Sequence, residues 1–188
     1  LEEMAKKFIN ENIKTEEDAI TGAKYIIAEW ISDNAYYRKS IRNYFYNNGI
    51  LSSKKKKNAE DFEEVYKMYY EYSEPVKRIK PHRILAVNRG EKEGVLSVSI
   101  DINNQDIVDY LEGKIVKNKS SFVYNSVMEA INDSLKRLIL PSVEREIRAE
   151  MTEDLRDMQE SVTRSTAQLL APVFACSVLL RTFMHRLS

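Results

Sequence analysis

The sequence predicts a mainly α-helical protein, a multi-helix scaffold with a small β element near residues 95–100. Glycine and proline are scarce, with 5 and 4 in 188 residues, while 31% of the residues are charged. This composition is typical of long helices joined by few tight turns. Apolar residues recur at three- and four-residue spacing in most segments, and only VLSVSI (95–100) alternates as a strand does.

The N-terminal part, residues 1–52, is predicted to be helical. Thr15 can cap a first helix, with Asp18 at the reciprocal position of a capping box. A second helix is expected from about Asp33 until Asn48-Gly49 ends it. The predicted buried stripe of the first helix has three- and four-residue spacing and consists of Ile20, Ala23, Ile27, Trp30 and Ile31.

The central region, residues 53–162, is predicted to be helical with one short strand. The lysine run 54–57 is expected to be a solvated loop, because adjacent lysines repel one another. A helix is then expected over 58–74, ended by Pro75. Its tyrosines can stack on bases, but helical spacing beside Phe62 and Val65 favours packing in a core. Pro81 is expected in the first turn of the next helix.

A long helix is expected from serine caps at residues 120–121, with an interruption at Pro141 and a charged continuation. Residues 163–188 form an atypical apolar tail. Its apolar run, 167–180, is too short to span a bilayer. So much apolar surface requires a partner, so we expect residues 165–188 to pack on the chain's own body or to mediate self-association, without a membrane.

Bulk charge identifies no partner, because 29 basic residues balance 29 acidic ones. Binding to phosphate would require a local patch. The candidates for nucleic-acid binding are Arg78, Lys80 and Arg83. The nearby His82, Arg89 and Glu91 are interpreted as structural polar ties that hold carboxylates or helix ends. Arg83 fits either interpretation.

Catalysis is not expected. The sequence contains no phosphate-binding glycine loop, no GxSxG motif and no HExxH motif. Its two histidines, His82 and His185, lie far apart, and the single Cys176 excludes an intrachain disulfide and a cysteine-based zinc site. We therefore predict that the chain is not an enzyme and requires neither a cofactor nor a metal.

Three separated blocks carry a family resemblance: GAKYIIAEWISDNA, HRILAVNRGEKEGVL and DSLKRLILPSVEREIRAEMTE. Together they resemble the Tex family of bacterial transcription accessory proteins, over about residues 1–151. A full member has an N-terminal helix-turn-helix region and a long helical middle, followed by an RNase-H-like domain, helix-hairpin-helix modules and an oligonucleotide-binding barrel. The chain resembles the helical portion that precedes the RNase-H-like domain, and it departs from the family after about Thr152.

The resemblance implies a cytoplasmic helical scaffold segment that binds nucleic acid, and contacts the transcription machinery, within the full-length protein. Binding by this segment alone is expected to be weak, because the segment has no net charge and lacks the barrel. The alternative is a protein–protein interaction module with no direct nucleic-acid contact. Basic side chains converging on an exposed groove would favour the first hypothesis, and an exposed apolar groove with an acidic rim would favour the second.

Overall fold

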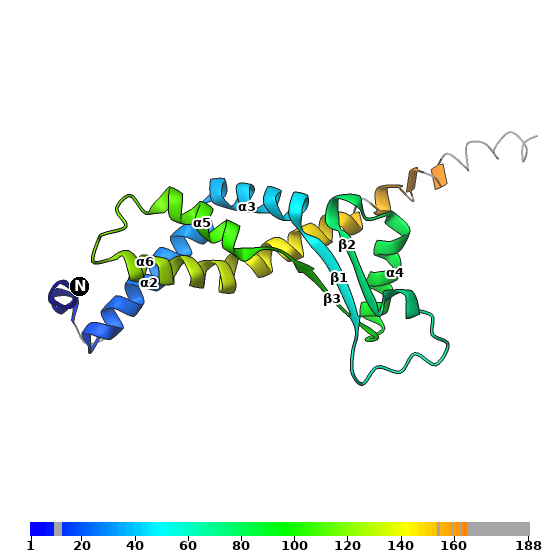
Figure 1. Ribbon diagram of the computed structural model, residues 1–188, viewed down its shortest axis with the longest axis horizontal. Helices are drawn as coiled ribbons and strands as arrows, with labels where there is room; N and C mark the ends of the chain where they lie inside the picture. Colours follow the sequence, from blue (N-terminus) through cyan, green and yellow to red (C-terminus); the bar gives the residue numbers. More distant parts are fainter. Residues whose placement is uncertain (10–12, 154, 159, 162, 165–188) are drawn as a thin grey trace, which may run out of the picture. The chain divides into compact units, whose positions relative to one another are not determined.

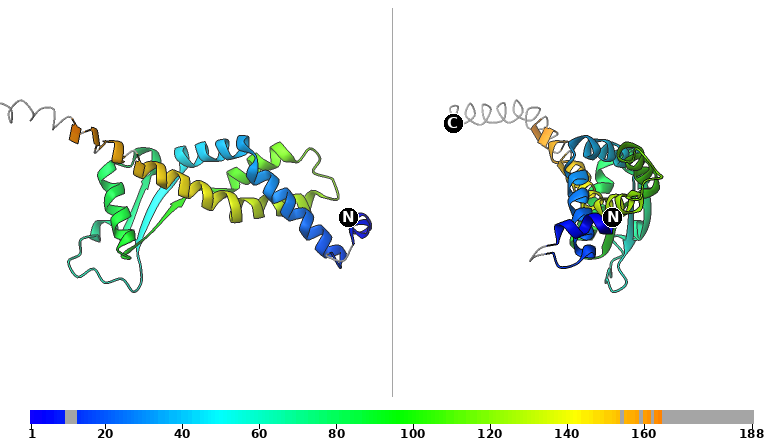
Figure 2. Two further views of the ribbon diagram at one scale, coloured as in Figure 1. Left: turned by 180° about the vertical axis from the view of Figure 1, so that it is seen from behind. Right: turned by 90° about the vertical axis from the view of Figure 1, so that its left-hand side faces the viewer.

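The computed structural model describes residues 1–9, 13–153, 155–158, 160, 161, 163 and 164 (Figures 1 and 2). The chain divides into two compact units, Leu1–Arg148 and Ala149–Ser188. Helices predominate among the described residues, and a three-stranded antiparallel sheet accompanies them. The mainly α fold class with a small β element is therefore confirmed. The predicted tail, 163–188, lies almost wholly outside the described residues.

Two helices follow a short N-terminal turn. After α1 (Glu2–Ala5) comes a 3₁₀ turn, Lys6–Phe8, and then α2 (Glu16–Asp33). The Thr15 hydroxyl accepts the Asp18 N–H at 3.0 Å, and the Asp18 carboxylate accepts the Thr15 N–H at 3.1 Å, which confirms the capping box. The third helix, α3 (Ala35–Asn48), ends immediately before Gly49, as predicted.

The buried face of α2 differs partly from the predicted stripe. Ala28 and Ile31 are fully buried, and Ile20 and Ile27 are half-buried. Trp30 is 55% exposed, and Ala23 is also exposed. Since each helical residue turns about 100°, Ala23 and Trp30 lie on an adjacent side of the helix, which faces solvent.

The sheet contains β1 (Ile50–Lys55), β2 (Glu71–Pro75) and β3 (Leu96–Asp101), in the order β2-β1-β3. The predicted loop at 54–57 is right only for residues 56 and 57, because Lys54 and Lys55 belong to β1, and the predicted helix over 58–74 is wrong. β1 pairs with β2 through Leu51↔Glu74 and Ser53↔Tyr72. This pairing satisfies the backbone of a tyrosine-containing segment that suits a strand as well as a helix.

A long loop, residues 56–70, joins β1 to β2 (Figure 1). Phe62 is 87% exposed and Val65 59% exposed on this loop, so the prediction that both pack in a core is wrong. Tyr66 is buried, with 4% exposure. The loop thus encloses one aromatic ring and presents other apolar side chains to water.

The fourth helix, α4 (Pro81–Lys92), has Pro81 in its first turn, as predicted, and packs against β3. Ile84 and Val87 are buried on this helix. Gly90 lies inside α4, where a Cβ would stand 2.7 Å from the Leu96 Cδ1. Gly94, with a φ of 80°, makes the turn toward β3.

The last part of the first unit contains α5 (Asn104–Ile115), α6 (Tyr124–Asp133) and a π-helical segment, Ser134–Ile139. α6 packs beside α2 (Figures 1 and 2). Val123, not a serine, occupies the N-cap of α6, so the predicted serine caps are wrong.

Helical structure continues through Pro141 to residue 148, so the predicted interruption at this proline is wrong. The Leu140 N–H bonds the Leu135 carbonyl, five residues back. Such wide turns change which backbone groups pair, and here they precede the position where proline supplies no donor. The apolar side of this long helical run is fully buried at Ile131, Ile139, Val143 and Ile147.

Candidate nucleic-acid interface at the start of α4

The candidate cations gather where α4 begins. A 3₁₀ turn, Val76–Arg78, leads into α4, and Lys80 is the N-cap residue. Arg78 and Lys80 are exposed, and neither has an ion-pair partner among the described residues. A helix N-terminus carries partial positive charge and free N–H groups, which favour phosphate. The local geometry therefore suits an anion better at this end of α4 than at its C-terminal Arg89-Gly90-Glu91 end.

Lys77 belongs to the same exposed cluster and was missed by sequence reasoning. Its ammonium group donates to the Asn47 side-chain oxygen at 3.3 Å, which places it beside the end of α3. The signal was present, because Lys77 immediately precedes Arg78. We name Lys77, Arg78 and Lys80 the α4 basic cluster.

Arg83 faces β2 and is held there. Its guanidinium donates to the Glu74 carboxylate at 2.8 Å, and it also interacts with the Tyr72 hydroxyl. The hydrogen bond from Tyr72, followed by that from Arg83, lowers the pKa of Glu74 below its ordinary value. Burial and the bond to Glu74 raise the pKa of Tyr72 to about 12. Arg83 therefore links α4 to β2 through the Glu74 carboxylate, which stays ionised near neutral pH.

The three proposed polar ties occupy different environments. His82 is exposed, and its side chain makes no hydrogen bond among the described residues, so the structure does not support its interpretation as a structural polar tie. Arg89 pairs with Glu93 at 2.8 Å on the surface, with 74% of the Arg89 side chain exposed. Glu91 is partly buried and accepts both arms of the Arg148 guanidinium, which joins α4 to the helical residues 140–148.

The tyrosines of the 56–70 loop are used internally. The Tyr66 hydroxyl donates to Glu93 at 2.7 Å, and the Tyr70 hydroxyl donates to Asp61 at 2.8 Å. The Asp61 carboxylate also accepts the N–H groups of Val65 and Tyr66. The Tyr66 N–H is the main reason that the pKa of Asp61 is lowered. With ring and hydroxyl both engaged, Tyr66 is not a platform for stacked bases.

An apolar groove is the second candidate surface. It has a volume of about 490 Å³ and is lined by α1, α2 and residues 122–127. Phe8, Ile26 and Phe122 stand at its edge with 65%, 69% and 70% of their surface exposed. Sequence reasoning missed this groove, although the signal was visible: α2 carries apolar residues on more than one side.

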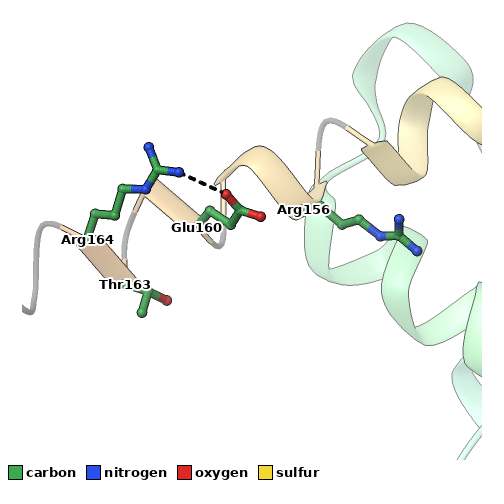
Figure 3. Close-up of a pocket in the computed structure, with 4 residues that line it drawn as sticks. All are labelled: Arg156, Glu160, Thr163 and Arg164. Atoms are coloured by element: carbon green, nitrogen blue, oxygen red, sulfur yellow. Dashed lines mark hydrogen bonds and ion pairs between the residues drawn. The ribbon is translucent and has the colours of Figure 1, made fainter.

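The second unit contains a shallow surface pocket at Arg156, Glu160, Thr163 and Arg164 (Figure 3). Arg164 pairs with Glu160 at 3.2 Å, while Arg156 points away from this pair. Paired charges on an exposed helix are ordinary surface features. In the described ranges no His, Cys, Asp and Glu cluster could hold a metal ion, and no helix is long and apolar enough to cross a membrane.

The fold is thus that of a helical scaffold with a small sheet, which presents a basic cluster and a separate apolar groove. The Tex central region-like family model matches residues 1–162, and the chain belongs to this family. Three relatives illustrate the match. The uncharacterized protein YdcI of Bacillus subtilis is 49% identical over 152 residues, which are 79% of this chain and 21% of YdcI.

The human S1 RNA-binding domain-containing protein 1 is 31% identical over 175 residues, or 84% of this chain and 17% of that protein. The transcriptional accessory protein Tex of Neisseria gonorrhoeae is 30% identical over 106 residues, or 56% of this chain and 14% of Tex. The chain thus spans about a fifth or less of the length of these relatives, and it corresponds to a Tex-like transcription accessory region.

Proposed function

We propose that this region is a non-catalytic scaffold which, in the cytoplasm and within a full-length transcription accessory factor, contacts nucleic acid through the α4 basic cluster. The observation that carries the proposal is the position of Arg78 and Lys80 at the start of a 12-residue helix, where both are exposed and neither has an ion-pair partner among the described residues. Two relatives, the human S1 RNA-binding domain-containing protein 1 and the transcriptional accessory protein Tex of Neisseria gonorrhoeae, support the same class of ligand by their names.

The expected affinity is low. Neutralising about three phosphates gives a steep salt dependence and a dissociation constant in the micromolar range or weaker, with little sequence preference. Glu74, a carboxylate that interacts with the Lys80 charge, is engaged by Arg83 and Tyr72. Its charge therefore opposes phosphate less than a free carboxylate would.

The test is a fluorescence-anisotropy titration of labelled single-stranded and duplex oligonucleotides at low salt. The double substitution Arg78→Ala, Lys80→Ala should abolish most of the binding. The matched control, Lys114→Ala, Lys117→Ala, removes the same charge from exposed positions at the end of α5 and should retain it. Equal losses in the two variants would show that binding follows net charge, and the assignment to α4 would be wrong.

A protein–protein interaction module remains the second candidate, and the apolar groove specifically favours it. A surface this apolar is typical of a docking site. Contact with the transcription machinery belongs to this proposal. Self-association through residues 165–188 stays a prediction, since that segment lies outside the described residues.

A further inference from the structure

The second helix, α2, has two apolar sides, and the chain covers only one of them well. Ile27, Ala28 and Ile31 face the interior. The adjacent side is apolar for about three turns but faces the groove or solvent, with Ile26 69% exposed and Trp30 55% exposed. It comprises Ala19, Gly22, Ala23, Ile26 and Trp30. A helix that is apolar around most of its circumference is normally enclosed, so a further element is expected against this side.

Gly22 is the position on this side of α2 where a second helix could approach most closely. A Cβ built at this residue meets no atom within 4 Å, so nothing in the described chain requires glycine there. Glycine inside a helix is less favourable than alanine by about 1 kcal/mol. Gly22 lowers the stability of α2 in this way and borders an open apolar groove. The absence of a side chain there would allow the backbone of a second helix to pack closely on α2.

The lining excludes a typical small polar ligand. Among the residues that the structure describes, Lys24 and Ser126 are the polar ones that line the groove, and Lys24 is ion-paired with Glu129. Binding sites for small molecules place several polar groups to orient the ligand, and this groove does not. Its floor is formed by helices, which offer no free strand edge, so recognition must occur through side chains, as when an amphipathic helix lies in a groove.

Acidic residues at the rim of the groove determine which charges a partner should carry. Glu2 and Glu3, in the first turn of α1, line a hollow that shares Leu1, Met4 and Phe122 with the groove. Neither carboxylate has an ion-pair partner in the part of the chain that the structure describes. Carboxylates at the border of an apolar patch favour cations on the partner and disfavour acids.

We propose that this groove binds an amphipathic helix of a partner protein. The apolar face of the partner packs on Gly22, Ile26 and Phe122, and its lysines or arginines face Glu2 and Glu3. The proposal deepens the second candidate function by naming the kind of partner. The proposed partner helix contacts none of the residues of the α4 basic cluster, so the helix-binding proposal and the nucleic-acid proposal can be refuted independently.

Trp30 provides the readout, because it is the sole tryptophan of the chain and lies one turn beyond Ile26 on the same side of α2. The probe is a designed 18-residue amphipathic peptide of leucine and lysine, without tryptophan. Titrated into the full 188-residue chain, this peptide should shift the Trp30 emission to shorter wavelength in a saturable manner. The same peptide with glutamate in place of lysine should bind about tenfold more weakly or not at all.

Two substitutions test the location. Ile26→Glu places a charge on an exposed side chain and should weaken the leucine–lysine peptide by about tenfold or more, as expected for an interface anchor. Phe62→Glu is the matched control, because Phe62 is 87% exposed on the 56–70 loop and should bind as the wild type does. Gly22→Leu should also block the peptide, since its side chain enters the open space of the groove, while thermal unfolding confirms that the variant is folded.

Control experiments distinguish the proposed partner helix from other possible occupants of the groove. Equal loss of binding in the Ile26→Glu and Phe62→Glu variants, or equal binding of the two peptides, would overturn the proposal. Sedimentation of the chain alone tests a second copy: a dimer that Ile26→Glu dissociates would show that the chain itself fills the groove, which would also overturn it. Loss of oligonucleotide binding in the Arg78→Ala, Lys80→Ala variant bears only on the nucleic-acid proposal.

Discussion

The same substitution, glycine to alanine, should have opposite effects in two helices of this chain. At Gly22 in α2, an added Cβ meets no atom within 4 Å. Alanine is favoured over glycine in a helix by about 0.8–1 kcal/mol. With no clash to oppose this preference, Gly22→Ala should raise the free energy of unfolding by about that amount.

At Gly90 in α4, the added Cβ would stand 2.7 Å from the Leu96 Cδ1 and 3.0 Å from the Tyr66 Cδ1. Both neighbours are buried, Leu96 at 0% and Tyr66 at 4% exposure, so neither can move aside into solvent. Overpacking of this kind costs about 1–3 kcal/mol. This cost exceeds the helix preference, so Gly90→Ala should lower the stability by as much as about 2 kcal/mol.

The comparison isolates the packing effect, because the helix preference is common to the two variants. Urea denaturation followed by circular dichroism should give midpoints on opposite sides of the wild type, with unchanged slopes. The free energies of unfolding should differ by about 1–3 kcal/mol. Equal midpoints for the two variants would refute the packing of α4 against β3 and the loop.

Three further predictions concern the polar ties and the loop. Arg83→Ala should lower the thermal midpoint, because Glu74 and Tyr72 lose their partner. It should weaken oligonucleotide binding much less than Arg78→Ala, Lys80→Ala does, since it only frees the Glu74 carboxylate to oppose phosphate; an unchanged midpoint with an equal loss of binding would make Arg83 a ligand contact. The pKa of Glu74 is lowered in the folded chain. Glu74 therefore stabilises the fold fully at pH values above its ordinary pKa of 4.5, and this stabilisation is lost as the pH falls through the lower pKa of the folded state. The stability difference between wild type and Glu74→Gln, measured by urea denaturation, should therefore shrink on acidification; a constant difference would contradict this. Phe62→Ser should change stability by less than about 0.5 kcal/mol, and a larger loss by the same measurement would show that Phe62 is packed.

Features that depend on neighbours in sequence were predictable. The capping box of Thr15 and Asp18, the end of α3 before Gly49 and the start of α4 at Pro81 all follow from bonds and backbone angles within one turn. The alternation of VLSVSI identified β3 because each second residue is buried. These local rules require no knowledge of the rest of the chain.

Features that depend on distant partners were not predictable. β1 and β2 were missed because their pairing, Ser53↔Tyr72 for example, joins residues far apart in the sequence, and neither segment alternates clearly. Periodicity suggested a helix over 58–74, but contacts with β1 determine the outcome. Trp30 was expected to be buried on helical spacing alone, whereas its exposure depends on which side of α2 its neighbours cover.

The different roles of the three basic site residues could not be predicted for the same reason, because they depend on a partner in another strand. Arg78, Lys80 and Arg83 are indistinguishable by charge in the sequence. The structure separates them because Glu74 of β2 lies within 2.8 Å of Arg83, whereas Arg78 and Lys80 extend from the start of α4. A structural arginine and two candidate ligand contacts therefore occur within six residues.

The most direct test of nucleic-acid contact at α4 is the salt dependence of oligonucleotide binding. Affinity for a duplex oligonucleotide should be measured over a range of salt concentrations for the wild type and for Arg78→Ala, Lys80→Ala. Contact of Lys77, Arg78 and Lys80 with phosphates predicts a slope of log K against log[salt] of about −3 for the wild type, reduced to about −1 in the variant. A slope that is the same in both proteins, or tight binding that survives moderate salt in the variant, would contradict it.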